Sequence, residues 1–363
     1  MALVLEHISK RVGAESHIDD VSLTLEPGGF HVLLGRTLAG KTTLMRLMAG
    51  LDRPTAGRIL MDGRDVTRDP VQKRNVAMVY QQFINYPSLN VYDNIASPLK
   101  VAGRDRAEID RRVREVAELV HIEMFLDRLP AELSGGQQQR CAMARALVKE
   151  ADLLLFDEPL VNLDYKLREE LRTEMREIFR TSGTIAVYAS TEPVEALSLG
   201  GHTAVLHEGR LAQFGRTVEV YHRPASVEVG KVFSDPPINL FPGRLDGRGL
   251  SIGRDIQVPQ IAHLRDLPGG ECQVGVRANH LFVQRHSEHD VAVDCEVELA
   301  EIGGSETFIH VRHGDIELTV QQEGIHVLTL GDRIPVFMDP RQLFVFDPGG
   351  KLLATPDRGA LAS

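Results

Sequence analysis

The stretch Gly35–Thr42, which reads Gly-Arg-Thr-Leu-Ala-Gly-Lys-Thr, constrains the fold of this 363-residue chain more than any other. The apolar run 31–34 before it predicts a buried strand, and the spacing of residues 43–49 after it predicts a helix. A glycine-rich turn in that context folds closely around phosphate groups, because backbone N–H groups and the positive end of the helix point at the anion. The expected nucleotide contacts are Gly35, Arg36, Thr37, Leu38, Ala39, Gly40, Lys41, Thr42 and Thr43.

Side chains at two strand ends complete a predicted hydrolytic site. We expect Lys41 to neutralise the β- and γ-phosphates and the Thr42 hydroxyl to hold Mg²⁺. The stretch 151–159, with its apolar run 153–156, predicts another buried strand that ends in Asp157 and Glu158, where an open α/β sheet binds its ligand. Asp157 would hold Mg²⁺ directly or through water, and Glu158 would accept the proton of the attacking water or orient that water.

A second anion site is predicted where a helix begins after Leu133. Ser134 is the predicted helix cap, and Gly135 and Gly136 leave backbone N–H groups uncovered at the helix start, just before Gln137. One chain needs a single site for one γ-phosphate. Two such sites in one chain are explained if two subunits face each other head to tail. The second anion site of each subunit would then cover the nucleotide bound in the cradle of the other.

The order of predicted elements gives the fold class. Strands that alternate with helices predict an α/β fold with a parallel sheet, and a strand-only beginning adds an antiparallel portion. After residues 235–237, short β-rich runs separated by turns predict a small β-barrel. We therefore expect a first domain over residues 1–235, with a helical subdomain at about 86–150, and a second domain over residues 236–363.

Composition excludes several classes of protein. The net charge of -10 argues against a general nucleic-acid binder, which needs a basic face. The three cysteines, Cys141, Cys272 and Cys295, form no C-x-x-C pair and fit reduced thiols in a cytosol. We expect no signal peptide, and no apolar run approaches the ~20 residues that span a bilayer. A membrane role would therefore depend on partner subunits.

Together these motifs resemble the ATP-binding subunits of ABC transporters. The resemblance implies an ATPase that uses ATP and Mg²⁺, in which Gln81 joins Thr42 and Asp157 at the metal ion and takes part in catalysis. It also implies a second cassette subunit, two polytopic permease subunits and, indirectly, a solute-binding protein, at the cytoplasmic face of the inner membrane. The matching segments are the Walker A stretch Gly35–Thr42, the Q-loop Gln81, the signature Leu133–Gln137, the Walker B end Asp157-Glu158 and the D-loop Asn162–Asp164.

Residues of the second half resemble a narrower branch of that family. Residues 209–225, 235–239 and 274–277 are similar to carbohydrate and glycerol-3-phosphate importers, in which an OB-like β-domain serves dimer contact and regulation. Residues 71–87 and 188–193 look more like glycerol-type polyol importers. Three alternatives stay open: a homodimeric sugar or glycerol-3-phosphate importer, a regulatory nucleotide-binding module with little turnover, and a motor or repair ATPase of the same superfamily.

The chain departs from the family pattern at the half that binds its own nucleotide. Val12 stands where an aromatic residue stacks on adenine, and Leu38 replaces a glycine of the cradle. Thr191 replaces the switch histidine, so one charged contact to the γ-phosphate is missing. Because the signature is intact, we interpret these changes as one half of a heterodimer with a weakened site of its own, in preference to neutral drift in a homodimer. Arg36 for proline and Val161 for the serine of the D-loop are further departures.

The region after Gln81 predicts a docking groove for a membrane subunit. In the family this region receives a helix of the permease, and apolar side chains suit helix-in-groove docking. The alternative is packing between the core and the helical subdomain. The side chains concerned are Phe83, Ile84, Tyr86, Pro87, Leu89, Val91 and Tyr92.

Overall fold

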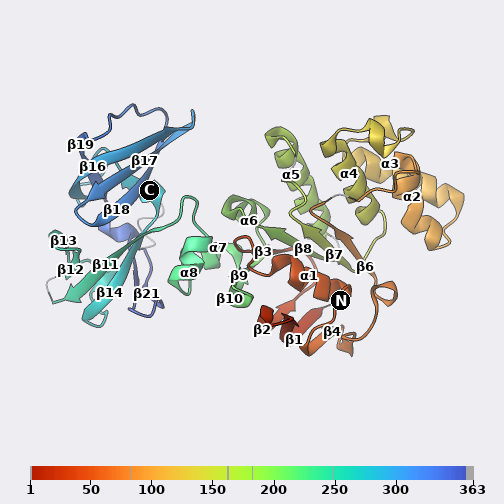
Figure 1. Cartoon of the computed structure of the whole chain (residues 1–363), viewed down its shortest axis with the longest axis horizontal. Coiled ribbons are helices and arrows are strands. Elements are labelled where there is room, and N and C mark those ends of the chain that lie inside the picture. Colours follow the sequence, from red (N-terminus) through yellow and green to blue (C-terminus); the bar gives the residue numbers. More distant parts are fainter. Residues whose placement is uncertain (1, 83, 162, 182, 248, 357–363) are drawn as a thin grey trace. The chain divides into compact units, whose positions relative to one another are not determined.

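A computed structural model of the chain divides into two compact units, Met1–Thr217 and Val218–Ser363 (Figure 1). Each unit has a hydrophobic core of its own, and each is described by itself below. No helix among the described residues is both long and apolar enough to cross a membrane. The described residues are 2–82, 84–161, 163–181, 183–247 and 249–356.

A six-stranded sheet forms the centre of the first unit, in the order β10-β9-β3-β8-β7-β6. Its inner strands are mostly apolar and are buried along their whole length, as expected of parallel strands covered on both faces. β3 runs parallel to β8 and β9, and β7 runs parallel to β6 and β8, so the carboxyl ends of these strands meet at one edge. The strands are β3 (Phe30–Leu34), β6 (Val76–Val79), β7 (Leu153–Asp157), β8 (Ile185–Ser190), β9 (His202–His207) and β10 (Arg210–Arg216).

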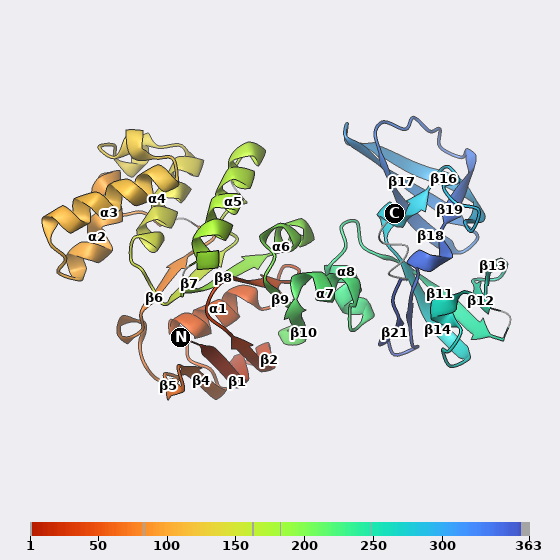
Figure 2. The same ribbon diagram turned by 180° about the vertical axis from the view of Figure 1, so that it is seen from behind.

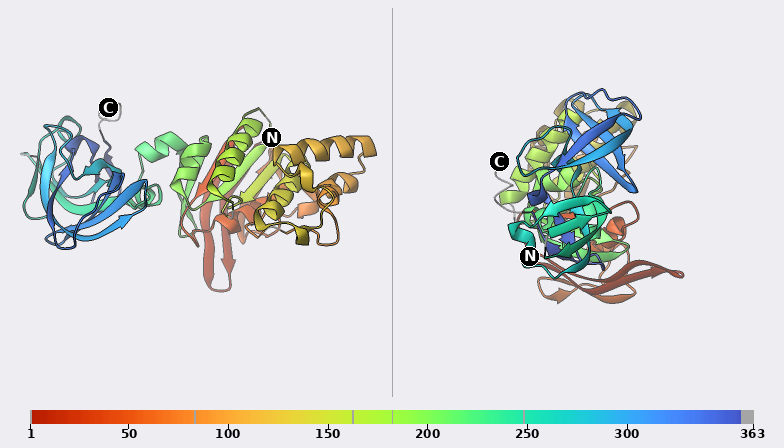
Figure 3. Two further views of the ribbon diagram at one scale, coloured as in Figure 1. Left: turned by 90° about the horizontal axis from the view of Figure 1, so that it is seen from above. Right: turned by 90° about the vertical axis from the view of Figure 1, so that its left-hand side faces the viewer.

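A four-stranded antiparallel sheet, β2-β1-β4-β5, covers the helix that follows the cradle. The hairpin of β1 and β2 stands away from the parallel sheet (Figure 3). One core cluster contains Leu5 and Ile18 of this sheet, Leu44 and Met48 of α1, and Leu155 of the parallel sheet. Helix α1 is therefore packed between two sheets, which confirms the predicted antiparallel portion. The elements are β1 (Leu3–Val12), β2 (Glu15–Leu25), α1 (Lys41–Ala49), β4 (Ala56–Met61) and β5 (Arg64–Asp65).

Helices α2, α3 and α4 form the helical part of this unit, beside the β6 end of the parallel sheet (Figure 2). Each begins at a polar side chain that accepts a hydrogen bond from the first turn: Asn90, Asp105 and Ser134. Two other helices connect the strands of the parallel sheet. The bounds are α2 (Val91–Val101), α3 (Arg106–Leu119), α4 (Gly135–Leu147), α5 (Tyr165–Thr181) and α6 (Pro193–Leu199).

The C-terminal end of α1 is fixed by a buried arginine. Arg74, 4% exposed, donates to the carbonyl oxygens of Leu47 at 3.2 Å and Met48 at 2.8 Å. It also donates to Val66 at 2.5 Å, so one guanidinium ties the helix end to the antiparallel sheet. Because carbonyls at a helix end have no partner within the helix, this contact holds α1 in place behind the cradle.

The second unit contains a small, nearly closed β-barrel, which confirms the predicted β-domain. Its two sheets have the orders β13-β12-β11-β14-β20-β21 and β15-β19-β16-β17-β18, and one apolar cluster fills the space between them. The sequence pattern predicted β14 and β16–β19 in part and missed six strands, of which β15, β20 and β21 have only two or three residues and β11 has eight. The strands are β11 (Asn239–Asp246), β12 (Gly249–Ile252), β13 (Ile256–Pro259), β14 (Gly270–Val276), β15 (Leu281–Phe282), β16 (Val291–Ile302), β17 (Glu306–His313), β18 (Ile316–Glu323), β19 (Arg333–Met338), β20 (Phe344–Phe346) and β21 (Leu352–Ala354).

Residues 218–235 belong to the second unit, whereas the sequence analysis assigned them to the first domain. Helix α7 (Thr217–His222) starts at the boundary, and α8 (Val227–Val232) packs on the barrel. Val227 belongs to a small apolar cluster with Ile238 and Phe346, and its N–H donates to the Gly350 carbonyl at 2.8 Å. The prolines at 236–237 mark a change of composition, but packing decides the compact units.

Arg277 holds this helical segment against the barrel. Its guanidinium carbon lies 3.7 Å from the centre of the Tyr221 ring and 4.9 Å from that of Phe344. It donates to the Tyr221 carbonyl at 2.6 Å and to Ser234 Oγ at 3.4 Å, while only 4% of the residue is exposed. Burial lowers the pKa of Arg277, so these contacts compensate the cost of a charge removed from water.

We expect Arg277→Ala to destabilise the second unit by about 2–4 kcal/mol, because two hydrogen bonds from a buried charge and its ring contacts are lost together. Arg277→Lys should restore only part of this, since an ammonium lacks the planar fork. The measurement is urea unfolding combined with amide exchange of residues 218–235. Arg333→Ala is the control, because Arg333 makes an exposed ion pair with Asp294 at 3.2 Å. Equal effects of the two alanine changes would contradict the assigned role.

Candidate active site

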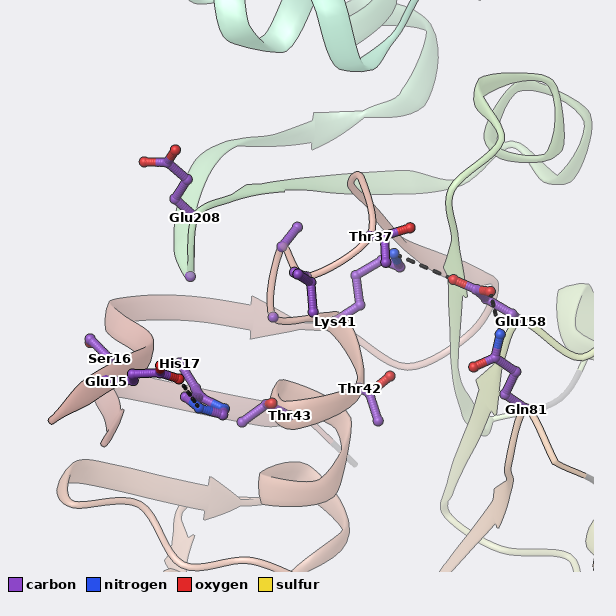
Figure 4. Close-up of a pocket in the computed structure, with 14 residues that line it drawn as sticks. Glu15, Ser16, His17, Thr37, Lys41, Thr42, Thr43, Gln81, Glu158 and Glu208 are labelled. Atoms are coloured by element: carbon purple, nitrogen blue, oxygen red, sulfur yellow. Dashed lines mark hydrogen bonds and ion pairs between the residues drawn. The ribbon is translucent and has the colours of Figure 1, made fainter. Parts of the chain in front are cut away.

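A pocket of about 650 Å³ lies at the edge of the first unit where the parallel strands end (Figure 4). It contains seven of the nine predicted cradle residues, together with Gln81 and Glu158. Residues of β2 and of the turn after β9 also line it, and the sequence analysis did not predict them. The lining residues are Glu15, Ser16, His17, Thr37, Leu38, Ala39, Gly40, Lys41, Thr42, Thr43, Gln81, Glu158, Glu208 and Gly209.

The cradle needs its glycines for steric reasons. Gly40 has a φ of 101°, and a Cβ there would lie 2.9 Å from the His17 carbonyl oxygen and 2.8 Å from Ile18 Cδ1. A Cβ on Gly35 would lie 2.6 Å from the Leu206 carbonyl oxygen. Leu38, the departure from the family pattern, has a φ of 68° and is 95% exposed, so it adopts a conformation that favours glycine.

Lys41 is buried at the first turn of α1, with its ammonium directed back over the cradle. Its Nζ donates to the Gly35 carbonyl at 2.8 Å and to the Arg36 carbonyl at 3.3 Å. Glu158 Oε1 lies 3.4 Å from the same Nζ. Burial lowers the pKa of Lys41, and Glu158 acts in the opposite sense. The ammonium is therefore placed at the mouth of the cradle, in a position to contact a phosphate oxygen.

Thr42 and Asp157 form a site that suits a magnesium ion. Thr42 Oγ1 donates to Asp157 Oδ2 at 2.8 Å and to Oδ1 at 3.1 Å. Asp157 is 3% exposed, and burial raises its pKa, which the hydrogen bond from Thr42 opposes. A hydroxyl and a buried carboxylate are the hard oxygen donors that Mg²⁺ prefers, and a cation would relieve the cost of burying this charge. The donor set thus fits the metal ion that the sequence predicted.

Glu158 lies at the centre of the polar contacts. It follows β7 with a φ of 47°, and its N–H donates to the Ala189 carbonyl at 3.2 Å. Gln81 Nε2 donates to Glu158 Oε2 at 3.0 Å, while Lys41 contacts the other oxygen. The structure therefore joins Gln81 to Glu158, the predicted base, and the contact of Gln81 with a metal ion stays a prediction.

Two predicted residues lie beside the pocket without lining it. Val12 is the last residue of β1 and is 52% exposed. Thr191, also exposed, comes directly after β8, where the Ser190 carbonyl accepts from the Gly35 N–H at 3.3 Å. Buried Glu195 anchors this turn through Ser190 Oγ at 2.6 Å, and burial raises the pKa of Glu195. Thr191 is thus placed next to the cradle but not inside the described pocket.

The signature residues form a complete helix cap at the start of α4. The Gln137 N–H donates to Ser134 Oγ at 3.3 Å, and the Ser134 N–H donates to Gln137 Oε1 at 2.9 Å. Ser134 and Gly135 are exposed, whereas Leu133 is buried. Among the described residues, none of 133–137 lines the pocket. The second predicted anion site is therefore separate from the cradle of the same chain.

The D-loop and the predicted groove are only partly described. Asn162 and Phe83 lie outside the described residues, while Asp164 Oδ1 accepts from the Leu167 N–H at 3.0 Å and caps α5. In the groove, Tyr86 is 50% exposed and Val91 is fully buried. Some side chains of this region therefore pack internally, as the alternative expects, others face outward, and docking of a membrane subunit stays a prediction.

Tyr86 is held in place by two side chains of the helical part. Asn94 accepts from the Tyr86 N–H at 2.8 Å and donates to the Tyr86 carbonyl at 3.0 Å. The Arg145 guanidinium carbon lies 4.9 Å from the centre of the Tyr86 ring. This half-exposed ring is thus presented on a fixed backbone, beside Ile84, which is 59% exposed.

The sequence analysis missed the side of the pocket made by β2 and the β9–β10 turn. The Gly209 N–H donates to the Ala39 carbonyl at 3.1 Å, and the Gly209 carbonyl accepts from the Asp19 N–H at 2.9 Å. The Glu-Gly pair at 208–209 could have been recognised as a hairpin turn. Its position over the cradle follows only from the pairing of β9 with β3.

Two family models match the chain. The model described as ABC transporter matches residues 18–161, and the model described as TOBE domain matches residues 274–346. The first match contains the cradle, the signature and the Asp157-Glu158 pair. The second lies within the barrel unit.

Several relatives match nearly the whole chain. The sn-glycerol-3-phosphate import ATP-binding protein UgpC 3 of Rhizobium etli is 38% identical over 93% of this chain and 92% of its own length. UgpC of Cupriavidus pinatubonensis is 36% identical over 95% of this chain and 97% of its own length. A solved ATP-binding cassette, a dimer in a post-hydrolysis state with ADP and Pi, is similar with a TM-score of 0.55 and 26% identity, over 59% of this chain and 98% of that cassette.

Proposed function

Because this chain belongs to the family of ABC transporter ATP-binding subunits, we propose that it powers the import of a glycerol-class solute, a small polyol or its phosphate ester. It is an ATPase that uses ATP and Mg²⁺. The relatives named as sn-glycerol-3-phosphate import proteins support the solute class. The observation that carries the proposal is the cluster of Lys41, the Thr42–Asp157 pair and the Glu158–Gln81 pair at one strand edge.

The positions of these side chains suggest how hydrolysis proceeds. Lys41 and the cradle N–H groups bind the phosphates, and Glu158 accepts a proton from the water that attacks the γ-phosphorus. The bond from that phosphorus to its bridging oxygen breaks, which releases ADP and phosphate. Gln81 orients Glu158 through the bond from Nε2 to Oε2. Mg²⁺, held by Thr42 and Asp157, would supply positive charge to the phosphate oxygens.

We further propose that the signature of this chain closes the nucleotide site of a partner cassette. The complete cap at Ser134 and its separation from the pocket support a head-to-tail dimer, as does the dimeric state of the similar solved cassette. In this proposal the partner is a different chain. The site of this chain is weakened by Val12, Leu38 and Thr191, while Lys41 and Glu158 keep their contacts and argue against a module without turnover.

The remaining partners in the proposal are two permease subunits and, through them, a solute-binding protein. Tyr86 and Ile84, exposed on a backbone that Asn94 fixes, would contact a permease helix. The subunit would then lie at the cytoplasmic face of the membrane through these partners. The barrel unit would serve dimer contact and regulation.

The first test addresses the chemistry. Lys41→Ala should abolish productive ATP binding, because the cation at the phosphates is lost. Glu158→Gln should retain binding and slow hydrolysis by ~10²–10⁴-fold, the usual contribution of a general base. ATP binding and single-site ATPase rates of the purified transporter provide the measurement. Wild-type turnover by Glu158→Gln at the site that this residue lines would refute its assignment as the base.

The second test addresses asymmetry between the two sites. Removing a donor to the transferring phosphate commonly costs ~3 kcal/mol, or about a hundredfold in rate, so the cradle beside Thr191 should be the slow site. Changing Ser134 and Gly135 together should therefore reduce the ATPase rate of the whole transporter more than Lys41→Ala does. Thr191→His should raise hydrolysis by the isolated subunit.

Steady-state ATPase assays of the reconstituted complex, with each change made separately, compare these losses. Equal losses of ATPase rate from the signature change and from Lys41→Ala, in a complex that contains only this cassette, would refute the heterodimer. The chain would then form a homodimer with an unusual switch residue. Mass spectrometry of the purified complex identifies the cassettes present.

The third test addresses docking. Tyr86→Glu should release the subunit from its permeases, because a charge cannot enter an apolar contact without loss of its hydration. Nucleotide binding should persist. Val101→Glu is the matched control, since Val101 is 92% exposed at the end of α2 in the same helical part. Co-purification in detergent is the measurement, and full retention of Tyr86→Glu with normal transport would count against the groove.

A further inference from the structure

The phosphate-binding pocket extends beyond the cradle to a histidine that no family pattern assigned. Lys41, Thr42 and Glu158 mark its phosphate end, and the pocket continues past Thr43 to His17 of β2. Figure 4 shows His17 beside Thr43, on the side of the pocket away from Glu158. A nucleotide has its phosphates at one end and its base at the other, so a triphosphate at Lys41 directs the base toward this histidine.

We propose that the His17 ring is the platform on which the nucleobase of ATP stacks, in place of the aromatic residue missing at Val12. This inference rests on the nucleotide site of the proposed function and adds a specificity-determining residue to it. Val12 of β1 and Glu15 of β2 form the last pair of the β1–β2 hairpin. The stacking residue in this proposal therefore lies on β2 and not on β1. Imidazole has the π-face that valine lacks.

The backbone at His17 is fixed against the cradle. A Cβ on Gly40 would lie 2.9 Å from the His17 carbonyl oxygen, and a Cβ on Gly209 would lie 2.7 Å from it. The carbonyl therefore fits between two glycines, one in the cradle and one in the β9–β10 turn. Ile18, the next residue, is fully buried and also approaches Gly40. These contacts set the distance between the His17 ring and the start of α1.

The His17 ring itself is left accessible on the pocket wall. Its side chain is 38% exposed, and Nε2 lies 3.7 Å from Glu15 Oε2. Glu15 is 86% exposed, so this pair orients the ring loosely and does not cover its face. Val12 is absent from the described pocket lining and is 52% exposed, so it offers no comparable surface. The competing explanation is a solvated surface ion pair with no ligand.

The test compares ATP with inorganic tripolyphosphate, which has the phosphates and no base. Calorimetric titration of the full chain in Mg²⁺ gives the affinity for each probe. His17→Ala should weaken ATP binding by between about fivefold and about a hundredfold, the range expected for loss of one base–aromatic stack, and leave tripolyphosphate binding within twofold. His17→Phe should restore ATP binding, because a phenyl ring provides the same stacking face.

Two variants provide comparison. His7→Asn is the matched control, because His7 is an exposed histidine of the same sheet, 2.8 Å from Asp20, and it does not line the pocket. Asn tolerates the φ of 51° at this position. Val12→Ala should leave ATP affinity unchanged if His17 is the platform.

The outcomes separate this inference from the nucleotide site itself. Unchanged ATP affinity in His17→Ala, or a loss that appears in Val12→Ala instead, would overturn the platform. A parallel loss of both probes in His17→Ala would also overturn it, since that pattern reports a distorted cradle. A wild-type chain that binds neither probe would refute the nucleotide site, which is a separate failure.

Discussion

The close approach of three backbone segments at Gly40 is the constraint on which the first unit depends. The cradle, the His17 carbonyl of β2 and Gly209 of the β9–β10 turn meet there with no room for a side chain. This contact joins the antiparallel sheet to the parallel sheet at the N-terminal end of α1. Arg74 holds the other end of α1 through the carbonyls of Leu47 and Met48. Helix α1 is therefore fixed at both ends, and the groups at its start keep a defined position relative to β7.

The position of α1 relative to β7 brings charged side chains together in a buried site. Lys41 and Asp157 are both almost completely buried. Glu158, the residue after Asp157, contacts Lys41, and Gln81, which follows β6, donates to Glu158. Two carboxylates face one ammonium, so the site favours additional positive charge, which Mg²⁺ provides. The same arrangement holds Glu158 where a proton can be accepted. Thr191 does not line the described pocket, so the contacts among Lys41, Thr42, Asp157, Glu158 and Gln81 form without it.

The second unit depends on a different kind of contact. Arg277, a buried cation between Tyr221 and Phe344, ties the segment after the ATPase unit to the barrel. A segment that connects two domains would ordinarily be exposed, but α8 contributes Val227 to an apolar cluster of the barrel. The helical segment 218–235 is therefore packed as part of the second unit.

Local interactions let the sequence by itself determine the cradle, the alternating strands and helices, and the cap at Ser134. A cap joins residues three apart, and a cradle is a single turn between a strand and the helix after it, so their spacing suffices. Only the tertiary structure decided that His17 and Gly209 line the pocket, that Val12 does not, and that residues 218–235 pack with the barrel. Those facts depend on strand pairings and apolar contacts between residues far apart in the chain. Such contacts carry no local pattern, because the side chains that meet are chosen by the packing of the whole unit.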